Sequence, residues 1–292
     1  MTGVRPWKVP ADGGVSVKWG EWLPLRPAHQ DAHPLHLDLS NLSFVDPLFL
    51  VRLRGFLDWH AARGHEVIVE PPSRMYVRNY LARMNICDEL PDRCTFNVGS
   101  VNSNPHPDVL IALRRLRTQR DADDLDEAVG NLLQAQFSGR LARYGDAFTM
   151  TIGEMCDNAI SHGRSAHGAY VAAQRYQGKR CVLAIGDLGI GIPEHLRRTH
   201  PHLTDDGEAI AEATKPRVTG VKGPRAQHRG NGYFHVIDEM RETAVPSGVL
   251  RVWAGNGRFS VAMTEGRATM RRGWTIEEPT AGTWVRLELG TG

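Results

Sequence analysis

The chain has 292 residues, which is enough for two ordinary domains. Its 35 basic and 33 acidic residues leave a net charge of +2, so charge gives no overall attraction to nucleic acid or to a membrane surface. The four cysteines form no C-x-x-C pair, which argues against a zinc site and favours free thiols in a reducing cytoplasm. No apolar run reaches the length of a signal peptide or of a membrane span, so we expect a cytoplasmic protein.

The first third of the chain contains two strand patterns. Residues 1–34 are rich in proline, glycine and tryptophan without a clear period, and either an irregular cap or short strands around residues 15–22 are expected. LHLDLS (residues 35–40) alternates apolar and polar side chains, as a half-buried strand does. HEVIVE (residues 65–70) is a second strand, which is stopped by two prolines.

Each of these strands is followed by a helix pattern. Asp46 and Pro47 suit the N-cap and first position of the first helix, and Gly64 suits its end. Ser73 is expected to cap the second helix. A strand–helix–strand–helix order predicts an α/β unit with parallel strands.

A Ser/Asn/Pro-rich stretch, Val98–Asp108, is the expected linker between two domains. Beyond it, RRLRTQR (Arg114–Arg120) is interpreted as a solvated helix face rather than a nucleic-acid patch, because an acidic run follows. Residues 121–137 then have apolar side chains at helical spacing behind an acidic first turn, which predicts an amphipathic helix.

The motif TIGEMCDNAISHG places Glu154, Asn158 and His162 at positions i, i+4 and i+8. On an α-helix this spacing puts a carboxylate, a carboxamide and an imidazole on one face. The amide oxygen of Asn158 can ligate Mg²⁺, which prefers oxygen ligands and shares its shell with substrate phosphates. Glu154 could then orient or deprotonate a water or hydroxyl aimed at the terminal phosphate.

The motif IGDLGIGIP places Asp187 at the end of an apolar strand, followed by glycines. A buried carboxylate needs a donor, and the exocyclic amine of adenine would be one. Gly189 and Gly191 lack a Cβ and let the backbone approach a ligand, and Ile192 joins them in the expected ligand-binding set.

A third motif, RGNGYF, opens a helix pattern that runs to about residue 242. Its Gly230, Asn231 and Gly232 form a glycine-rich turn at a helix N-terminus, where free N–H groups and the helix dipole bind phosphate. The remaining chain alternates apolar and polar residues and ends in GTWVRLELG, a strand introduced by Thr283. These patterns predict a sandwich with a mixed, mostly antiparallel sheet and helices on one face.

Together the motifs resemble the GHKL superfamily of Bergerat-fold ATPases over roughly residues 122–292. EMCDNAISHG is similar to the N box, DLGIGI to the G1 box, RGNGYF to a shortened G2 box and the late Gly-Thr to the last adenine-site element. The resemblance implies that Asn158 holds Mg²⁺, Glu154 is the base or the water-orienting group, Asp187 reads adenine, and Thr283 supports that contact through water. Tyr233 and Phe234 depart from the G2 pattern, which puts fast turnover in doubt more than binding.

The same resemblance implies that the polar segment between Pro193 and Gly230 is an ATP lid. Lys215 and Lys222 of this segment would face the triphosphate. A solvated loop with ordinary surface charge is the alternative.

Residues 34–98 resemble a STAS domain in their strand, turn, helix and strand. The position where phosphorylatable relatives carry a serine or threonine is Pro47, and Ser40 and Ser43 are poor substitutes. The usual phosphorylation switch is therefore absent, and an α/β domain that only docks on its neighbour is the alternative. We expect a STAS-like regulatory or docking domain at residues 1–103 and a GHKL ATP-binding domain at residues 104–292.

The sequence thus predicts a regulatory protein that binds Mg²⁺ and ATP, hydrolyses ATP slowly and couples lid closure to the regulation of a protein partner. Two alternatives remain open: a serine kinase resembling the anti-sigma-factor kinases, and an ATP-dependent switch without catalysis. A homodimer is compatible with the sequence, whereas membrane and nucleic acid are not expected as partners.

Overall fold

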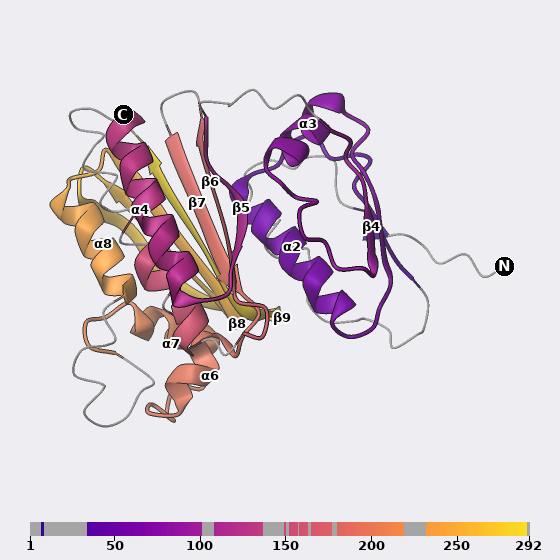
Figure 1. Cartoon of the computed structure of the whole chain (residues 1–292). Coiled ribbons are helices and arrows are strands. Elements are labelled where there is room, and N and C mark those ends of the chain that lie inside the picture. Colours follow the sequence, from indigo (N-terminus) through magenta and orange to yellow (C-terminus); the bar gives the residue numbers. More distant parts are fainter. Residues whose placement is uncertain are drawn as a thin grey trace.

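The computed structural model describes residues 7–8, 34–100, 108–136, 149, 152–156, 158–162, 165–176, 180–218 and 232–290. The strands expected around residues 15–22 and most of the expected linker lie outside these ranges. Figure 1 shows a small sheet and a larger, twisted sheet, with helix α2 between them. Within the described ranges, no helix combines the length and the apolar character that a membrane span requires.

The small sheet is parallel throughout, as the strand–helix alternation predicts. Its four strands are arranged in chain order: β1 (Trp7–Lys8), β2 (Leu35–Asp38), β3 (Val67–Glu70) and β4 (Cys94–Phe96). The helices α2 (Pro47–Ala61) and α3 (Met75–Arg83) belong to the same half of the chain.

The expected start of α2 is confirmed. Asp46 is the N-cap, its Oδ1 accepts a hydrogen bond of 3.0 Å from the Phe49 N–H, and Pro47 occupies the first turn. The expected cap of α3 is wrong, because Arg74 occupies the N-cap position without a side-chain hydrogen bond. Ser73 instead donates its backbone N–H to the Ser40 carbonyl, which ties the start of α3 to the end of β2.

The larger sheet has the strand order β5–β6–β7–β9–β8, and every neighbouring pair is antiparallel. Its strands are β5 (Val109–Leu116), β6 (Ala169–Tyr176), β7 (Arg180–Asp187), β8 (Ser247–Thr264) and β9 (Arg267–Gly290). The interpretation of residues 114–120 as a helix face is wrong in its first part. Arg114 and Arg115 lie in edge strand β5, and the helix begins only at Gln119.

Helices cover one face of this sheet, as expected for an α/β sandwich, and the predicted fold class is confirmed. They are α4 (Gln119–Gln136), α6 (Gly191–Arg197), α7 (Asp206–Ala213) and α8 (Gly232–Glu242) (Figure 1). One hydrophobic core lies between these helices and the sheet and includes Leu125, Ile185, Val236 and Val285.

The opposite face of the larger sheet is covered as well. Helix α2 packs against β6 and β7 there, and all of its residues except Trp59 and Ala61 are buried. The second hydrophobic core combines side chains of the N-terminal half, such as Phe56 and Met84, with Trp253 and Trp284 of the larger sheet. Side chains of the N-terminal half therefore pack against the larger sheet.

Candidate functional site

Glu154 and Asn158 face the first turn of helix α8. Residues 152–156 are helical, and Asn158–His162 form a π-helical turn. A Cβ atom at Gly232, the first residue of α8, would lie 2.8 Å from Glu154 Oε2 and 3.3 Å from Asn158 Nδ2. Glycine at this position lets the carboxylate and the carboxamide lie close against the helix start, and a larger residue would require the Glu154 side chain to shift.

The π-helical turn changes the arrangement expected from the sequence. The spacing i, i+4, i+8 aligns three side chains only on a regular α-helix. Residues Asn158–His162 are instead π-helical, with more residues per turn. The alignment therefore cannot be extended to His162 by α-helical spacing, and the side chain of His162 lies outside the described part of the chain.

Sequence reasoning missed a further polar neighbour of Glu154. His235 lies one turn into α8, and its Nδ1 is 3.4 Å from Glu154 Oε1. Both side chains are partly exposed, with 42% and 36% of their surface accessible, so both are within reach of a ligand. His235 follows Gly232 by three residues, so the two lie on the same face of α8. This spacing is the sequence signal that could have identified His235 as a site residue.

Asp187 is buried at the end of strand β7. Its Oδ1 accepts a hydrogen bond of 2.6 Å from the Gly189 N–H, and its carboxyl also accepts the backbone N–H of Thr283. Burial outweighs both hydrogen bonds and raises the pKa of Asp187 to about 7. Among the described residues the carboxyl accepts these two N–H groups, and an additional N–H donor would be strongly favoured at such a buried carboxyl.

Glycines bring β7, β9 and the start of α6 together around Asp187. Gly282 has a φ of +71°, and a Cβ atom there would lie 1.8 Å from the Asp187 carbonyl oxygen. Gly191 has a φ of +77°, and its Cβ would lie 3.1 Å from the Gly282 carbonyl oxygen. In the register of the sheet Asp187 pairs with Thr283, so the two residues expected at an adenine site are direct neighbours.

Tyr233 connects the two groups of residues. It follows Gly232 in α8 and is buried, and burial, followed by the charge of Asp187, raises the pKa of its hydroxyl. The Asp187 carboxyl thus lies within electrostatic range of the Tyr233 hydroxyl. Through Gly232 and Tyr233, which are neighbours in α8, the group of Glu154 and Asn158 is linked to the pair of Asp187 and Thr283.

Other residues predicted for the site are placed less centrally. Ile192 in α6 is partly buried and packs against the core beneath the helices. Lys215 follows α7 and is exposed, with its Nζ 2.6 Å from Glu212 Oε2. Lys222, Gly230 and Asn231 lie outside the described residues.

Part of the segment expected to form a lid is folded against the sheet. Helix α7 contacts β8 and β9, and its Ala209 and Ile210 are fully buried. A Cβ atom at Gly207 would lie 2.6 Å from the backbone of Trp274, so the helix lies directly on the strand. Helix α7, which belongs to the segment expected to form the lid, is therefore packed on the sheet in this structure.

Comparisons with known proteins give structural likenesses only. No protein-family model matches the chain, and no curated protein sequence matches it. The B-subunit of the DNA gyrase from Myxococcus xanthus is similar over 58% of this chain and 42% of the gyrase chain, with 12% identity and a TM-score of 0.33. The 43K ATPase domain of Thermus thermophilus gyrase B, solved with an aminocoumarin, is similar over 51% and 34%, with 18% identity and a TM-score of 0.29.

The chain thus spans less than half the length of either gyrase chain. Structural similarities with such low sequence identity and TM-score say nothing about the activity of this chain.

Proposed function

We propose that the chain binds ATP together with Mg²⁺ between the end of β7 and the start of α8. The observation that carries the proposal is the convergence of two chemically different groups on one region. A carboxylate and a carboxamide lie against a glycine at a helix start, and a buried acceptor lies beside a glycine-lined strand pair. A nucleotide triphosphate needs both an anion- and metal-binding end and a base-binding end.

The base-binding end is Asp187. Its buried carboxyl would accept the exocyclic amine of adenine, which supplies the donor that burial makes favourable. The Gly189 and Thr283 N–H groups already hold the carboxyl in place, so it would not have to move on binding. Guanine has a carbonyl oxygen at the corresponding position, and a carboxylate repels it.

The phosphate-binding end is the start of α8 with Asn158 and Glu154. The helix dipole and the free N–H groups of the first turn favour anions, and Gly232 allows close approach. The donor set fits Mg²⁺, because the Asn158 carboxamide oxygen is the kind of ligand that this ion prefers. When bound, the ion would neutralise charge on the phosphates.

Glu154 would orient or deprotonate the water that attacks the terminal phosphate. Its contact with His235 gives the carboxylate a polar partner on α8, so its position depends on the same helix that holds the phosphates. We further propose that turnover is slow and that residues 104–292 form the ATP-binding domain. Residues 1–103 would form a STAS-like docking domain through which ATP binding regulates a protein partner.

Binding is tested by thermal unfolding with ATP or GTP, each with and without Mg²⁺. A ligand present at a hundredfold excess over its Kd stabilises the native state by ~2.7 kcal/mol, which raises the melting temperature by several degrees. We expect this rise with ATP and Mg²⁺ and a much smaller one with GTP. Equal shifts with both nucleotides would remove Asp187 from its assigned role.

The fate of the phosphate is tested with γ-labelled ATP. Release of free phosphate supports slow hydrolysis, and labelled protein after addition of a partner supports the serine kinase. Binding without either product supports the non-catalytic switch.

A further inference from the structure

Trp284 lies between two glycines on the face of the larger sheet that α2 covers. Its side chain is fully buried. A Cβ atom at Gly55 of α2 would lie 2.4 Å from Trp284 Cη2, and one at Gly186 of β7 would lie 2.2 Å from Cε3. The indole is therefore held against helix and strand backbone on both sides, with no space for a larger residue.

This contact is one residue away from the proposed base-binding end. In the sheet register Gly186 pairs with Trp284, and the next pair is Asp187 with Thr283. Successive residues of a strand point to opposite faces. The Gly186–Trp284 pair, which contacts α2, and the Asp187–Thr283 pair, which would contact adenine, therefore point to opposite faces of the sheet at adjacent positions.

Helix α2 holds β9 at two further points on either side of Trp284. Arg52 donates from Nη2 to Thr280 Oγ1 at 2.9 Å, and its guanidinium lies 5.3 Å from the centroid of the Trp284 ring. Arg286 Nε lies 3.1 Å from Asp46 Oδ2, at the N-cap of α2. Thr280, Trp284 and Arg286 of β9 therefore all contact α2 or its N-cap residue.

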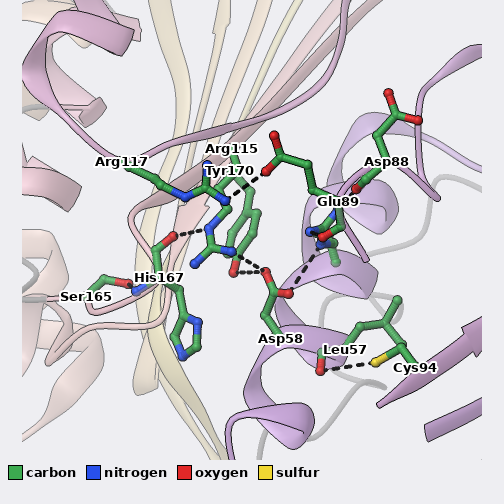
Figure 2. Close-up of polar contacts among 11 residues, drawn as sticks. Leu57, Asp58, Asp88, Glu89, Cys94, Arg115, Arg117, Ser165, His167 and Tyr170 are labelled. Atoms are coloured by element: carbon green, nitrogen blue, oxygen red, sulfur yellow. Dashed lines mark hydrogen bonds and ion pairs between the residues drawn. The ribbon is translucent and has the colours of Figure 1, made fainter. Parts of the chain in front are cut away.

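A buried polar group keeps α2 from sliding on the sheet. Figure 2 shows Asp58 of α2 facing Tyr170 of β6 and Arg115 of β5. The Tyr170 hydroxyl donates to Asp58 Oδ2, and Arg115 Nη1 lies 3.7 Å from the same oxygen. The Tyr170 ring is parallel to the Trp284 ring within 7°, at a centroid distance of 6.5 Å. The position of α2 and the position of the indole are thus set together.

We propose that Gly55 and Trp284 are positioning residues for base recognition. The N-terminal half of the chain would act through them on the Asp187–Thr283 pair and so set the preference for ATP over GTP. This inference rests on the proposed ATP site. Hydrogen bonds weaken steeply with misalignment, so a small displacement of β9 by α2 is enough to change selectivity without any contact between α2 and the nucleotide.

The test is Gly55→Ala, whose added methyl group must push the indole or the helix away. We expect ATP affinity to fall about tenfold and the ATP-to-GTP affinity ratio to fall with it, since one weakened hydrogen bond is of this size. The double variant Gly55→Ala/Trp284→Phe removes the outer ring that meets the methyl group and should recover part of the ratio. Recovery of selectivity by a second core substitution is not expected from a purely structural role.

Leu81→Ala is the matched control, because Leu81 in α3 is fully buried in the same core of the N-terminal half. It should lower the melting temperature while leaving the ATP-to-GTP ratio unchanged. If Gly55→Ala does not fold, Trp284→Phe alone is measured, which leaves space beside Gly55 and should also lower the ratio.

An unchanged ratio in the folded Gly55→Ala protein, or in Trp284→Phe, overturns the inference while leaving the ATP site intact. Failure of the parent protein to bind ATP removes the proposed function, and this inference with it. The two failures are distinguished by measuring the parent protein first.

Discussion

Replacing Asp187 by asparagine should make the protein more stable at alkaline pH. Burial raises the pKa of Asp187 from 3.8 to about 7, so between these values the native state keeps a proton that the unfolded chain has lost. The free energy of unfolding therefore falls as pH rises through this window, by about 1.4 kcal/mol per pH unit and about 4 kcal/mol in total. Asparagine does not ionise, so the free energy of unfolding of the variant does not fall in this way as pH rises.

At alkaline pH the Asp187→Asn variant gains less stability than the roughly 4 kcal/mol that the parent loses when Asp187 ionises. Asparagine has one acceptor oxygen for the N–H groups of Gly189 and Thr283, and an unmade hydrogen bond costs about 1–3 kcal/mol. We expect the variant to exceed the parent by about 1–3 kcal/mol at about pH 8 and to fall below it at about pH 5.

Urea unfolding at both pH values measures the two free energies. Parallel curves for parent and variant across this range would refute the reasoning, because Asp187 would then not carry the raised pKa. Above about pH 7, where Asp187 is ionised, the same variant should also bind ATP and GTP with similar affinity, since the charged acceptor for adenine is gone.

The remaining predictions concern the phosphate-binding end and the interface. Glu154→Gln should keep ATP binding but lower turnover by ~10²–10⁴-fold, and unchanged turnover in a phosphate-release assay would place the base elsewhere. Asn158→Ala should weaken binding with Mg²⁺ but not without it, which titration calorimetry measures. Asp58→Ala should cost about 3–5 kcal/mol in urea unfolding, because Arg54 and Arg115 lose a buried carboxylate. A fragment of residues 108–292 should be poorly soluble, because it exposes Trp284; a well-dispersed fragment in light scattering would contradict this.

Most of the architecture could be predicted because its signals are local. The N-cap at Asp46, the alternating strand LHLDLS and the apolar strand that ends at Asp187 each follow from a few neighbouring residues. The cap of α3 was mistaken because Ser73 uses its backbone in a contact with Ser40, which no local pattern reveals. Strand β5 was missed because its second half carries arginines, and an edge strand tolerates them.

The parts of the site that could not be predicted depend on contacts between distant segments. Glu154 and Gly232 were each identified from a motif, but their approach depends on how α8 lies on the sheet. The role of Gly55 has no signal in its own helix, where glycine only weakens helix propensity. The reason for a glycine at this position is the close contact with the Trp284 ring, and Trp284 lies more than two hundred residues later in the chain.

That separation has a consequence for synthesis. The contacts that join α2 to β9 link residues 228 and 240 positions apart. At ~5–20 residues per second, β9 leaves the ribosome roughly 10–50 s after α2. Throughout that interval α2 has only the small sheet beside it, and the face that packs on β6 and β7 is uncovered. The nascent N-terminal half therefore keeps an apolar helix face exposed until β9 is made, and such surface is prone to aggregate.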